Sequence, residues 1–189
     1  MSTILNTLSK GLLEFSSSCL RWPSTRELVF LLCLTLLGLL GNYLNIELFF
    51  GVNFLFGSVA TMIALRTSGA LWGTLIGVVI GSYTYVLWGH PYAIIIFGLE
   101  AFIVGFSIWC MKKNNMILTD VIFWLVAGMP LVWIFYSYQL GLSETPMYLI
   151  ALKQTINGIT NVVIANLIIQ FSPVLRWSGV IKQSVANGK

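Results

Sequence analysis

The sequence of 189 residues contains very little charge: only 8% of its residues are Asp, Glu, Lys or Arg. A soluble domain carries about 25% charged residues, so this chain could not cover a water-facing surface. It also has one histidine, and its three cysteines show no CxxC spacing. These shortages exclude an HExxH zinc site and a Cys/His metal cluster, and no GxxxxGK[ST] phosphate loop is present. No catalytic residue, metal or cofactor is predicted in these residues, and no nucleic-acid partner.

The sequence is instead rich in long apolar runs, and 58% of its residues are hydrophobic. Six runs reach the roughly 17–25 residues that a membrane-spanning helix needs. They are continuous and lack the alternation of β-barrel strands. The predicted spans are about 27–44, 48–66, 70–88, 91–110, 116–138 and 147–171. The sequence therefore predicts an all-α integral membrane protein, a six-transmembrane-helix bundle in contact with the lipid bilayer.

The positive charges of the tails and loops alternate with the predicted spans. The segments before the first span, after the second and fourth, and after the sixth hold Lys10, Arg21, Arg26, Arg66, Lys112, Lys113, Arg176, Lys182 and Lys189. The other three loops hold Glu47, His90 and Glu144 and no Lys or Arg. Because cytoplasmic loops are enriched in Lys and Arg, both termini are expected in the cytoplasm. Residues 1–26 then form a cytoplasmic or interfacial segment, 27–171 the membrane domain, and 172–189 a cytoplasmic tail or connector.

Glycine recurs at every fourth position at the start of the third predicted span, at Gly69, Gly73, Gly77 and Gly81. Residues four apart lie on nearly the same face of a helix. Small residues in such a row let neighbouring membrane helices approach closely. The row predicts a packing face, either within one chain or between two copies in a homodimer.

Polar residues inside the predicted spans indicate a ligand site in their outer half. A charge at the bilayer centre costs at least about 2.5–3.5 kcal/mol and is usually retained for function. Glu100 and Lys153 lie roughly 13 Å and 9 Å from the outer ends of their spans. The predicted ligand-binding residues are Asn53, Tyr83, Tyr85, His90, Glu100, Lys153 and Asn157. They would bind a small polar molecule or a proton.

Structural explanations of these residues remain open beside the functional one. Glu100 and Lys153 could form a buried ion pair, with the asparagines of the last span bonding helix to helix. His90 could simply end a loop before Pro91. Asp120 lies one turn into the fifth span, where the helix dipole favours an acid. Pro130 lies in the middle of that span, where it predicts a kink and a possible hinge.

Several runs form a recognisable pattern: residues 51–58 (GVNFLFGS), 82–96 (SYTYVLWGHPYAIII), Glu100 with Val104 and Gly105, 128–132 (GMPLV) and 153–158 (KQTING). This pattern resembles the multi-pass N-terminal membrane module of certain bacterial signalling proteins. In that family the module precedes a histidine kinase or diguanylate cyclase output. The resemblance implies a sensory module of two-component or cyclic-nucleotide signal transduction in the bacterial inner membrane. Any output would lie in a cytoplasmic domain beyond Lys189 or in a partner protein.

The six-helix plan is also similar to the substrate-binding subunits of energy-coupling-factor vitamin transporters. That family docks its partner through an Ala-xxx-Ala face on the first helix. Here the spacing occurs in the second predicted span, at Ala60 and Ala64. A small-solute uptake subunit is thus one alternative function, and a structural membrane anchor is another.

Overall fold

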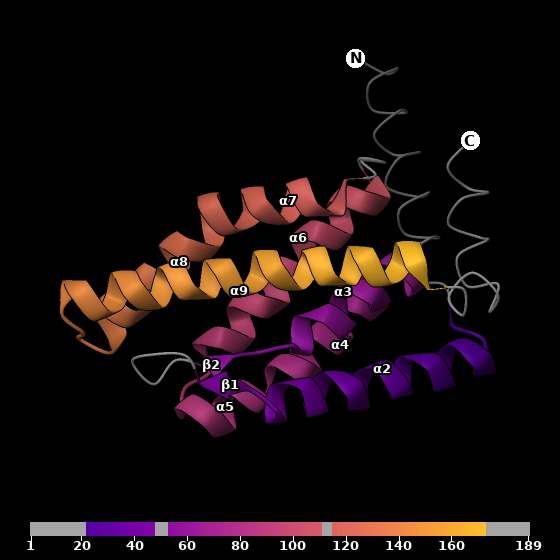
Figure 1. Ribbon diagram of the computed structural model, residues 1–189, viewed down its shortest axis with the longest axis horizontal. Coiled ribbons are helices and arrows are strands. Elements are labelled where there is room, and N and C mark those ends of the chain that lie inside the picture. Colours follow the sequence, from indigo (N-terminus) through magenta and orange to yellow (C-terminus); the bar gives the residue numbers. More distant parts are fainter. Residues whose placement is uncertain (1–21, 48–52, 111–114, 173–189) are drawn as a thin grey trace, which may run out of the picture.

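The computed structural model describes residues 22–47, 53–110 and 115–172, of which 84% are helical (Figure 1). The predicted all-α class is confirmed. Most of the predicted N-terminal segment 1–26 and of the tail 172–189 lies outside the described residues.

Within the described residues, four helical stretches are long and apolar enough to cross a membrane. They are α2 (Thr25–Tyr43), α4 with α5 (Ala70–Gly81, Tyr83–Trp88), α6 (Tyr92–Cys110), and α7 with η1, α8 and η2 (Met116–Phe123, Trp124–Gly128, Met129–Ile134, Phe135–Gln139). Large apolar side chains point outward from them; Leu36 is 66% and Val126 72% exposed. Such surfaces suit lipid rather than water, as expected of a membrane protein.

The helix α2 begins at a capping box formed by its own first residues, Ser24 and Glu27. The Ser24 hydroxyl accepts a hydrogen bond from the Glu27 N–H, and the Glu27 carboxylate accepts one from the Ser24 N–H. This reciprocal capping box satisfies backbone donors that the first turn leaves free. It sets the start of α2 two residues before the predicted boundary.

The second predicted span is not one continuous helix. Its helical part, α3 (Gly57–Ser68), has 12 residues, about 18 Å in length. Before it, β2 (Asn53–Phe54) pairs antiparallel with β1 (Ile46–Glu47), and residues 48–52 lie outside the described part. The prediction of a helix over 48–66 is therefore wrong for residues 53–56, and Asn53 lies in a strand.

The sixth predicted span corresponds to α9 (Glu144–Phe171), a helix of 28 residues. It is long enough to cross a bilayer, but its polar side chains make it less apolar than the four candidate spans. Six crossings were predicted, and only four of the described helical stretches meet both the length and the apolarity of a membrane span.

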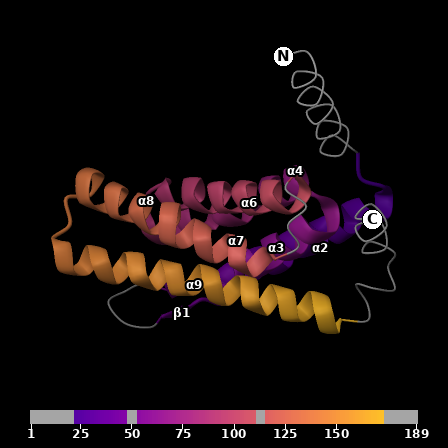
Figure 2. The same cartoon turned by 90° about the horizontal axis from the view of Figure 1, so that it is seen from above.

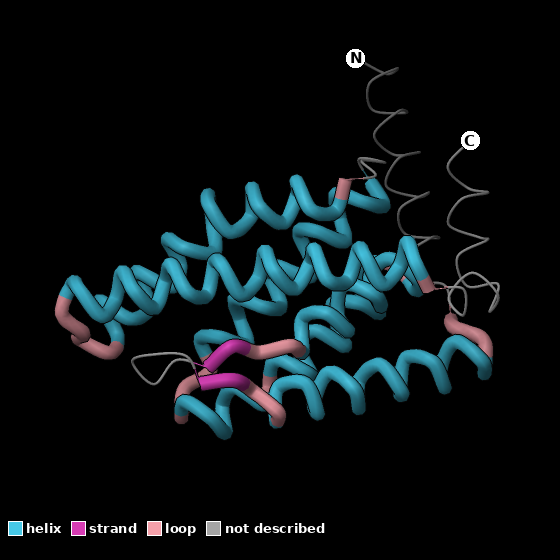
Figure 3. The backbone as a smooth tube through the Cα atoms, viewed as in Figure 1, coloured by secondary structure: helices cyan, strands magenta, loops and turns pink. Residues whose placement is uncertain are grey.

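The elements run between two ends of an elongated bundle. In Figure 1 the start of α2, the end of α9 and the start of α7 lie at the right, and the strands and α5 lie toward the left. Figure 2 shows α9 alongside α7 and α8, with α4 next to α6 on the other side. The tube of Figure 3 makes clear how small the two-stranded ribbon is beside the helices. In this view α2 and α7 therefore run in the direction opposite to that of α9.

Two apolar clusters form the core of the described residues. The first, the Leu65 cluster, includes Met62, Leu65, Ala101, Val104, Ile108, Met116, Val162 and Ala165. The second, the Phe97 cluster, includes Leu55, Ala93, Ile96, Phe97, Phe123, Trp124, Met147 and Ala151. Along α6, α7 and α9, the chain passes from one cluster to the other at buried polar residues.

The glycine row differs from position to position in how closely a neighbour approaches. Gly69 has a φ of 96° and precedes α4 rather than lying inside it. A Cβ on Gly73 would lie 2.7 Å from the Leu65 Cα, and one on Gly77 would lie 2.9 Å from the Thr61 Cγ2. At Gly81 nothing is nearer than 3.6 Å. The close approach of α3 and α4 therefore depends on Gly73 and Gly77.

Replacing Gly73 by alanine is expected to lower the free energy of unfolding by about 1–3 kcal/mol, because the backbone at Leu65 must move to make room. The matched variant Gly81→Ala should be neutral or stabilising by about 0.5–1 kcal/mol, since glycine is the poorer helix former. Unfolding of both variants by sodium dodecyl sulfate from detergent micelles measures the difference. Equal stabilities would contradict the predicted close contact.

Candidate functional site

Five buried polar or amphipathic residues lie where the two apolar clusters meet. They are Glu100 on α6, Asp120 on α7, Trp124 at the start of η1, and Asn157 and Asn161 on α9, and together they are called the polar layer here. None is more than 1% exposed. Polar groups buried to this degree need partners, so their contacts show what the layer does.

Glu100 and Trp124 form the best-defined contact of the polar layer. The Trp124 Nε1–H donates a hydrogen bond of 2.8 Å to Glu100 Oε1. The indole is held from both sides, because a Cβ on Gly158 would overlap with Nε1 and one on Gly128 would lie 3.0 Å from Cδ2. Because Gly128 and Gly158 have no side chains, the indole ring fits between α9 and the helix that carries it.

Asp120 lies one helical turn before Trp124, on the same face of the helix. Its carboxyl group and that of Glu100 are neighbours that act on each other electrostatically. Apart from the Glu100 carboxyl, no described residue lies within hydrogen-bonding reach of either Asp120 oxygen. A fully buried carboxyl without a donor calls for one, in the form of a proton, an ion or a water molecule.

The helix that carries Asp120 and Trp124 is distorted next to them. Pro130 has no N–H, and its ring crowds the preceding turn. The chain accommodates it with a π-helical turn, in which the Met129 N–H donates to the Trp124 carbonyl. Such π turns occur frequently at functional sites. Pro130, the predicted hinge residue, therefore lies two residues after the π turn Trp124–Gly128.

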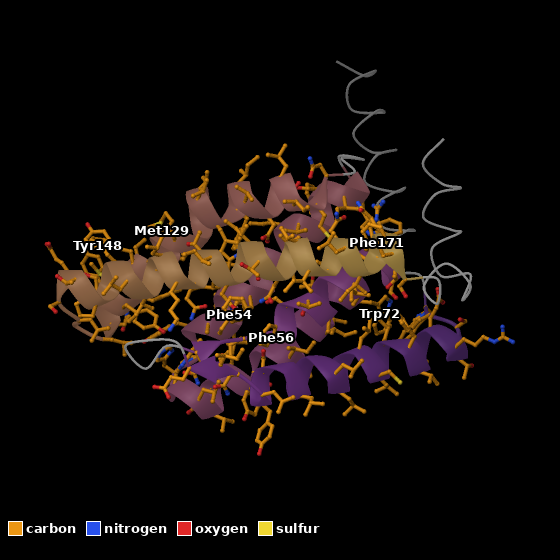
Figure 4. The ribbon with its side chains drawn as sticks, viewed as in Figure 1. Phe54, Phe56, Trp72, Met129, Tyr148 and Phe171 are labelled. Carbon is orange, nitrogen blue, oxygen red and sulfur yellow. The ribbon has the colours of Figure 1, made fainter. Side chains whose placement is uncertain are left out.

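Asn157 and Asn161 bind the backbone of the extended segment before α3. Asn157 Oδ1 accepts the Leu55 N–H at 3.1 Å, and Asn161 Nδ2 donates to the Leu55 carbonyl at 2.7 Å. Figure 4 shows Phe54 and Phe56 between the two ends of α9, which Tyr148 and Phe171 mark. Non-helical backbone at membrane depth requires such internal partners. These bonds explain why the chain can leave the helical conformation there.

A third asparagine, Asn42, binds the start of α3 from the other side. Asn42, on α2, accepts the Gly57 N–H at 2.8 Å and donates to the Ile80 carbonyl at 3.0 Å. It therefore joins α2, α3 and α4 at one point. Its role, like that of Asn157 and Asn161, includes holding the bundle together.

The remaining predicted ligand-binding residues lie apart from the polar layer. Asn53 Nδ2 donates to Asn45 Oδ1 at 2.6 Å within the ribbon segment. Lys153 is buried on α9, where the carboxylate of Glu47 acts on it. Tyr83 is half-buried, and Tyr85 is 54% exposed on α5.

His90 lies in an aromatic cluster between α5 and α6. Its ring stacks on Tyr92 at 5.1 Å and on Trp88 at 6.2 Å, and it meets the edge of Tyr136 at 5.3 Å. Partial burial lowers the pKa of the imidazole, and a hydrogen bond with its own backbone opposes this shift only in part. The ring is therefore neutral at pH 7, packed with its aromatic neighbours.

The seven predicted residues come from different parts of the bundle, and two cavities can be compared with their positions. Two cavities lie among the described residues, each of about 10 Å³, which is room for about one water molecule. Their linings include Asn42, Ser58 and Thr61 in one case and Trp88, Tyr136 and Gln154 in the other. None of the seven lines either cavity. An ion pair of Glu100 with Lys153 is not formed either; the groups that act on Glu100 are Asp120 and Trp124.

Asp120, Trp124 and Asn161 are the polar-layer residues that were not predicted as ligand-binding. For Asp120, the helix dipole is a sufficient local explanation of an acid near the start of a helix, so the sequence alone does not indicate that it contacts Glu100. A signal was nevertheless present, because Asp120 and Trp124 are four residues apart and share one helix face. An indole donor one turn from an acid in an apolar helix marks a polar face that must contact another helix.

Comparison with known proteins assigns no family. No protein-family model matches the chain, and no curated protein or solved structure shows significant similarity to it. The polar layer itself therefore carries the functional inference.

Proposed function

We propose that the chain is the sensory input module of a bacterial signal-transduction protein, embedded in the inner membrane with both termini in the cytoplasm. A proton or a small polar ligand reaches the polar layer from the periplasmic side and changes the packing of α7, α8 and α9. The observation that carries this proposal is the bond from Trp124 to Glu100, because Trp124 is also the first residue of the π turn.

The contacts around Trp124 suggest how binding would be passed on. A change in the charge of the polar layer alters the strength of the Trp124–Glu100 bond, since hydrogen bonds to ionised groups are about twice as strong as neutral ones. The indole touches the backbone of α9 at Gly158, so it cannot move without moving that helix or its own. Because α9 leads to the C-terminal tail, its shift would reach an output domain beyond Lys189 or a partner protein.

Among the described residues, no group of three or more His, Cys, Asp or Glu side chains could hold a metal ion. Arg66 lies in the last turn of α3, whereas Glu47 lies in β1 and Glu144 in the first turn of α9. The proposed orientation places the end of α3 on the cytoplasmic side, as the positive-inside rule favours.

An uptake subunit for a small solute is the second candidate, and one observation favours it. Secondary transporters bind solutes and ions where a membrane helix is interrupted. The extended residues before α3, bound by Asn157 and Asn161, form such an interruption. Solute accumulation in proteoliposomes would distinguish transport from sensing, because a sensor changes conformation without moving the solute across the membrane.

The proposed function predicts a conformational response that depends on Glu100 and Trp124. In lipid nanodiscs, the protection of backbone amides in α8 and in the second half of α9, taken relative to the intrinsic exchange rate at each pH, should change between acidic and mildly alkaline pH, or on adding a panel of amino acids. The variants Glu100→Gln and Trp124→Phe should each abolish the change. Glu144→Gln, the same type of substitution at the exposed start of α9, should leave the conformational response unchanged.

A wild-type chain whose exchange stays constant under all these conditions would rule out the sensory function. An uptake subunit and a structural anchor would then remain, and solute accumulation in proteoliposomes would distinguish between them.

A further inference from the structure

The polar layer contains two acids, and no Lys, Arg or His of the described part of the chain acts on either of them. Glu100 comes from α6 and Asp120 from α7, and both are buried, at 1% and 0% exposure. The groups that act on Glu100 are Asp120 and Trp124, and the group that acts on Asp120 is Glu100. Water therefore does not screen the two carboxyls from each other.

The other titratable groups of the surrounding helices act elsewhere. Among the described residues, five α-helices pack against α6. Three of them carry titratable residues, namely α3 (Arg66), α5 (Tyr83 and Tyr85) and α7 (Asp120), whereas α4 and α8 carry no titratable residue. Against α7 pack α6 with Glu100 and α9 with Lys153, Glu144 and Tyr148. Arg66 lies in the last turn of α3, and Lys153 is under the influence of Glu47. None of these groups acts on the acid pair.

Two like charges at this depth cannot both persist. Their repulsion is several-fold stronger at the effective dielectric constant of a protein than in water. Carboxyl groups that share a buried site therefore keep a proton between them. No N–H or O–H group of another described residue donates to either Asp120 oxygen, so the only hydrogen-bonding neighbour of this carboxyl is the other acid, Glu100.

The geometry also discriminates among the species that could supply that donor. The two carboxyls offer four oxygens, one of which already accepts a hydrogen bond from Trp124, whereas Ca²⁺ takes 6–8 and Mg²⁺ requires an octahedral shell. An organic ligand needs a pocket of roughly 300 Å³ or more. The two cavities found among the described residues have about 10 Å³ each, and neither is lined by Glu100 or Asp120. A proton needs only two facing oxygens.

We infer that Glu100 and Asp120 share one exchangeable proton, and that this proton is the ligand of the polar layer. The inference rests on the proposed function and names its stimulus. With the proton present, the protonated carboxyl donates to its partner, and the pair carries one negative charge. Loss of the proton leaves two facing carboxylates, which must move apart, and Glu100 can move only together with Trp124 or by breaking their bond.

Infrared difference spectroscopy of the wild-type protein in nanodiscs tests the inference. The carbonyl stretch of a protonated carboxyl should be present at neutral pH, shift on transfer to heavy water, and disappear on alkalinisation with release of about one proton per chain. Glu100→Gln and Asp120→Asn should each remove this band. Glu47→Gln and Glu144→Gln, which change acids outside the polar layer, should retain it.

Three results would overturn the inference. The band could be missing from the folded wild-type protein, which needs no variant to fold. It could persist in both Glu100→Gln and Asp120→Asn, which would assign it to another group. It could also vanish on adding sodium at constant pH, which would identify a metal cation as the ligand.

The outcome is separable from that of the proposed function. A titrating band with constant hydrogen exchange in α8 and α9 would support the shared proton and contradict the sensory function. A response of hydrogen exchange to a solute, without a titrating band, would support the sensor and contradict the shared proton.

Discussion

Replacing Asn157 and Asn161 together by leucine is expected to lower the free energy of unfolding more than any other change of side chains in the polar layer. The N–H and the carbonyl of Leu55 would both lose their hydrogen-bond partners, and because Leu55 is buried, water could not replace them. Each buried backbone group left without a partner costs about 1–3 kcal/mol, so the pair should cost about 2–6 kcal/mol. Unfolding in mixed micelles, followed by circular dichroism, measures this loss.

Asn166→Leu is the matched control for that double variant. Asn166 lies on the same helix but is only half-buried and outside the polar layer, so its replacement should leave stability nearly unchanged. If the double variant unfolds at the same denaturant concentration as Asn166→Leu, the two asparagines do not support the extended segment.

Replacing Gly158 by leucine is expected to be comparably damaging and also to separate Trp124 from Glu100. A side chain at this position overlaps with the indole Nε1, so the ring must leave its place. Overpacking costs about 1–3 kcal/mol. The loss of the indole donor leaves a buried carboxyl oxygen unpaired, for about a further 1–3 kcal/mol. Thermal inactivation in detergent and the hydrogen-exchange response of α9 would report the two effects.

A smaller ring at position 124 gives a specific check on the cause. If the clash with the indole is responsible, Trp124→Phe should restore part of the stability that Gly158→Leu removes, because phenylalanine lacks the atoms that overlap. Additive losses in the double variant would show that Gly158 acts through some other contact.

Local sequence predicted several helices within two residues of their bounds. The predicted span 91–110 is α6 (Tyr92–Cys110), and 70–88 is the stretch Ala70–Trp88. Apolar length and the chain breaks near Gly69, Gly89 and Pro91 are properties of neighbouring residues, so they can be read along the chain. The same reasoning failed at residues 53–56, where the backbone partners are 102 and 106 residues away.

The sequence by itself determined that this is an all-α membrane protein and that Glu100 is an unusual residue in an apolar helix. Only the tertiary structure decided which partner Glu100 has. Lys153 and Asp120 both offer a charge at a suitable position along the chain, and the packing of α6 against α7 brings Asp120 and Trp124 to the Glu100 carboxyl. The physical reason is that apolarity is a sum over adjacent residues, whereas a hydrogen bond depends on which helix faces meet.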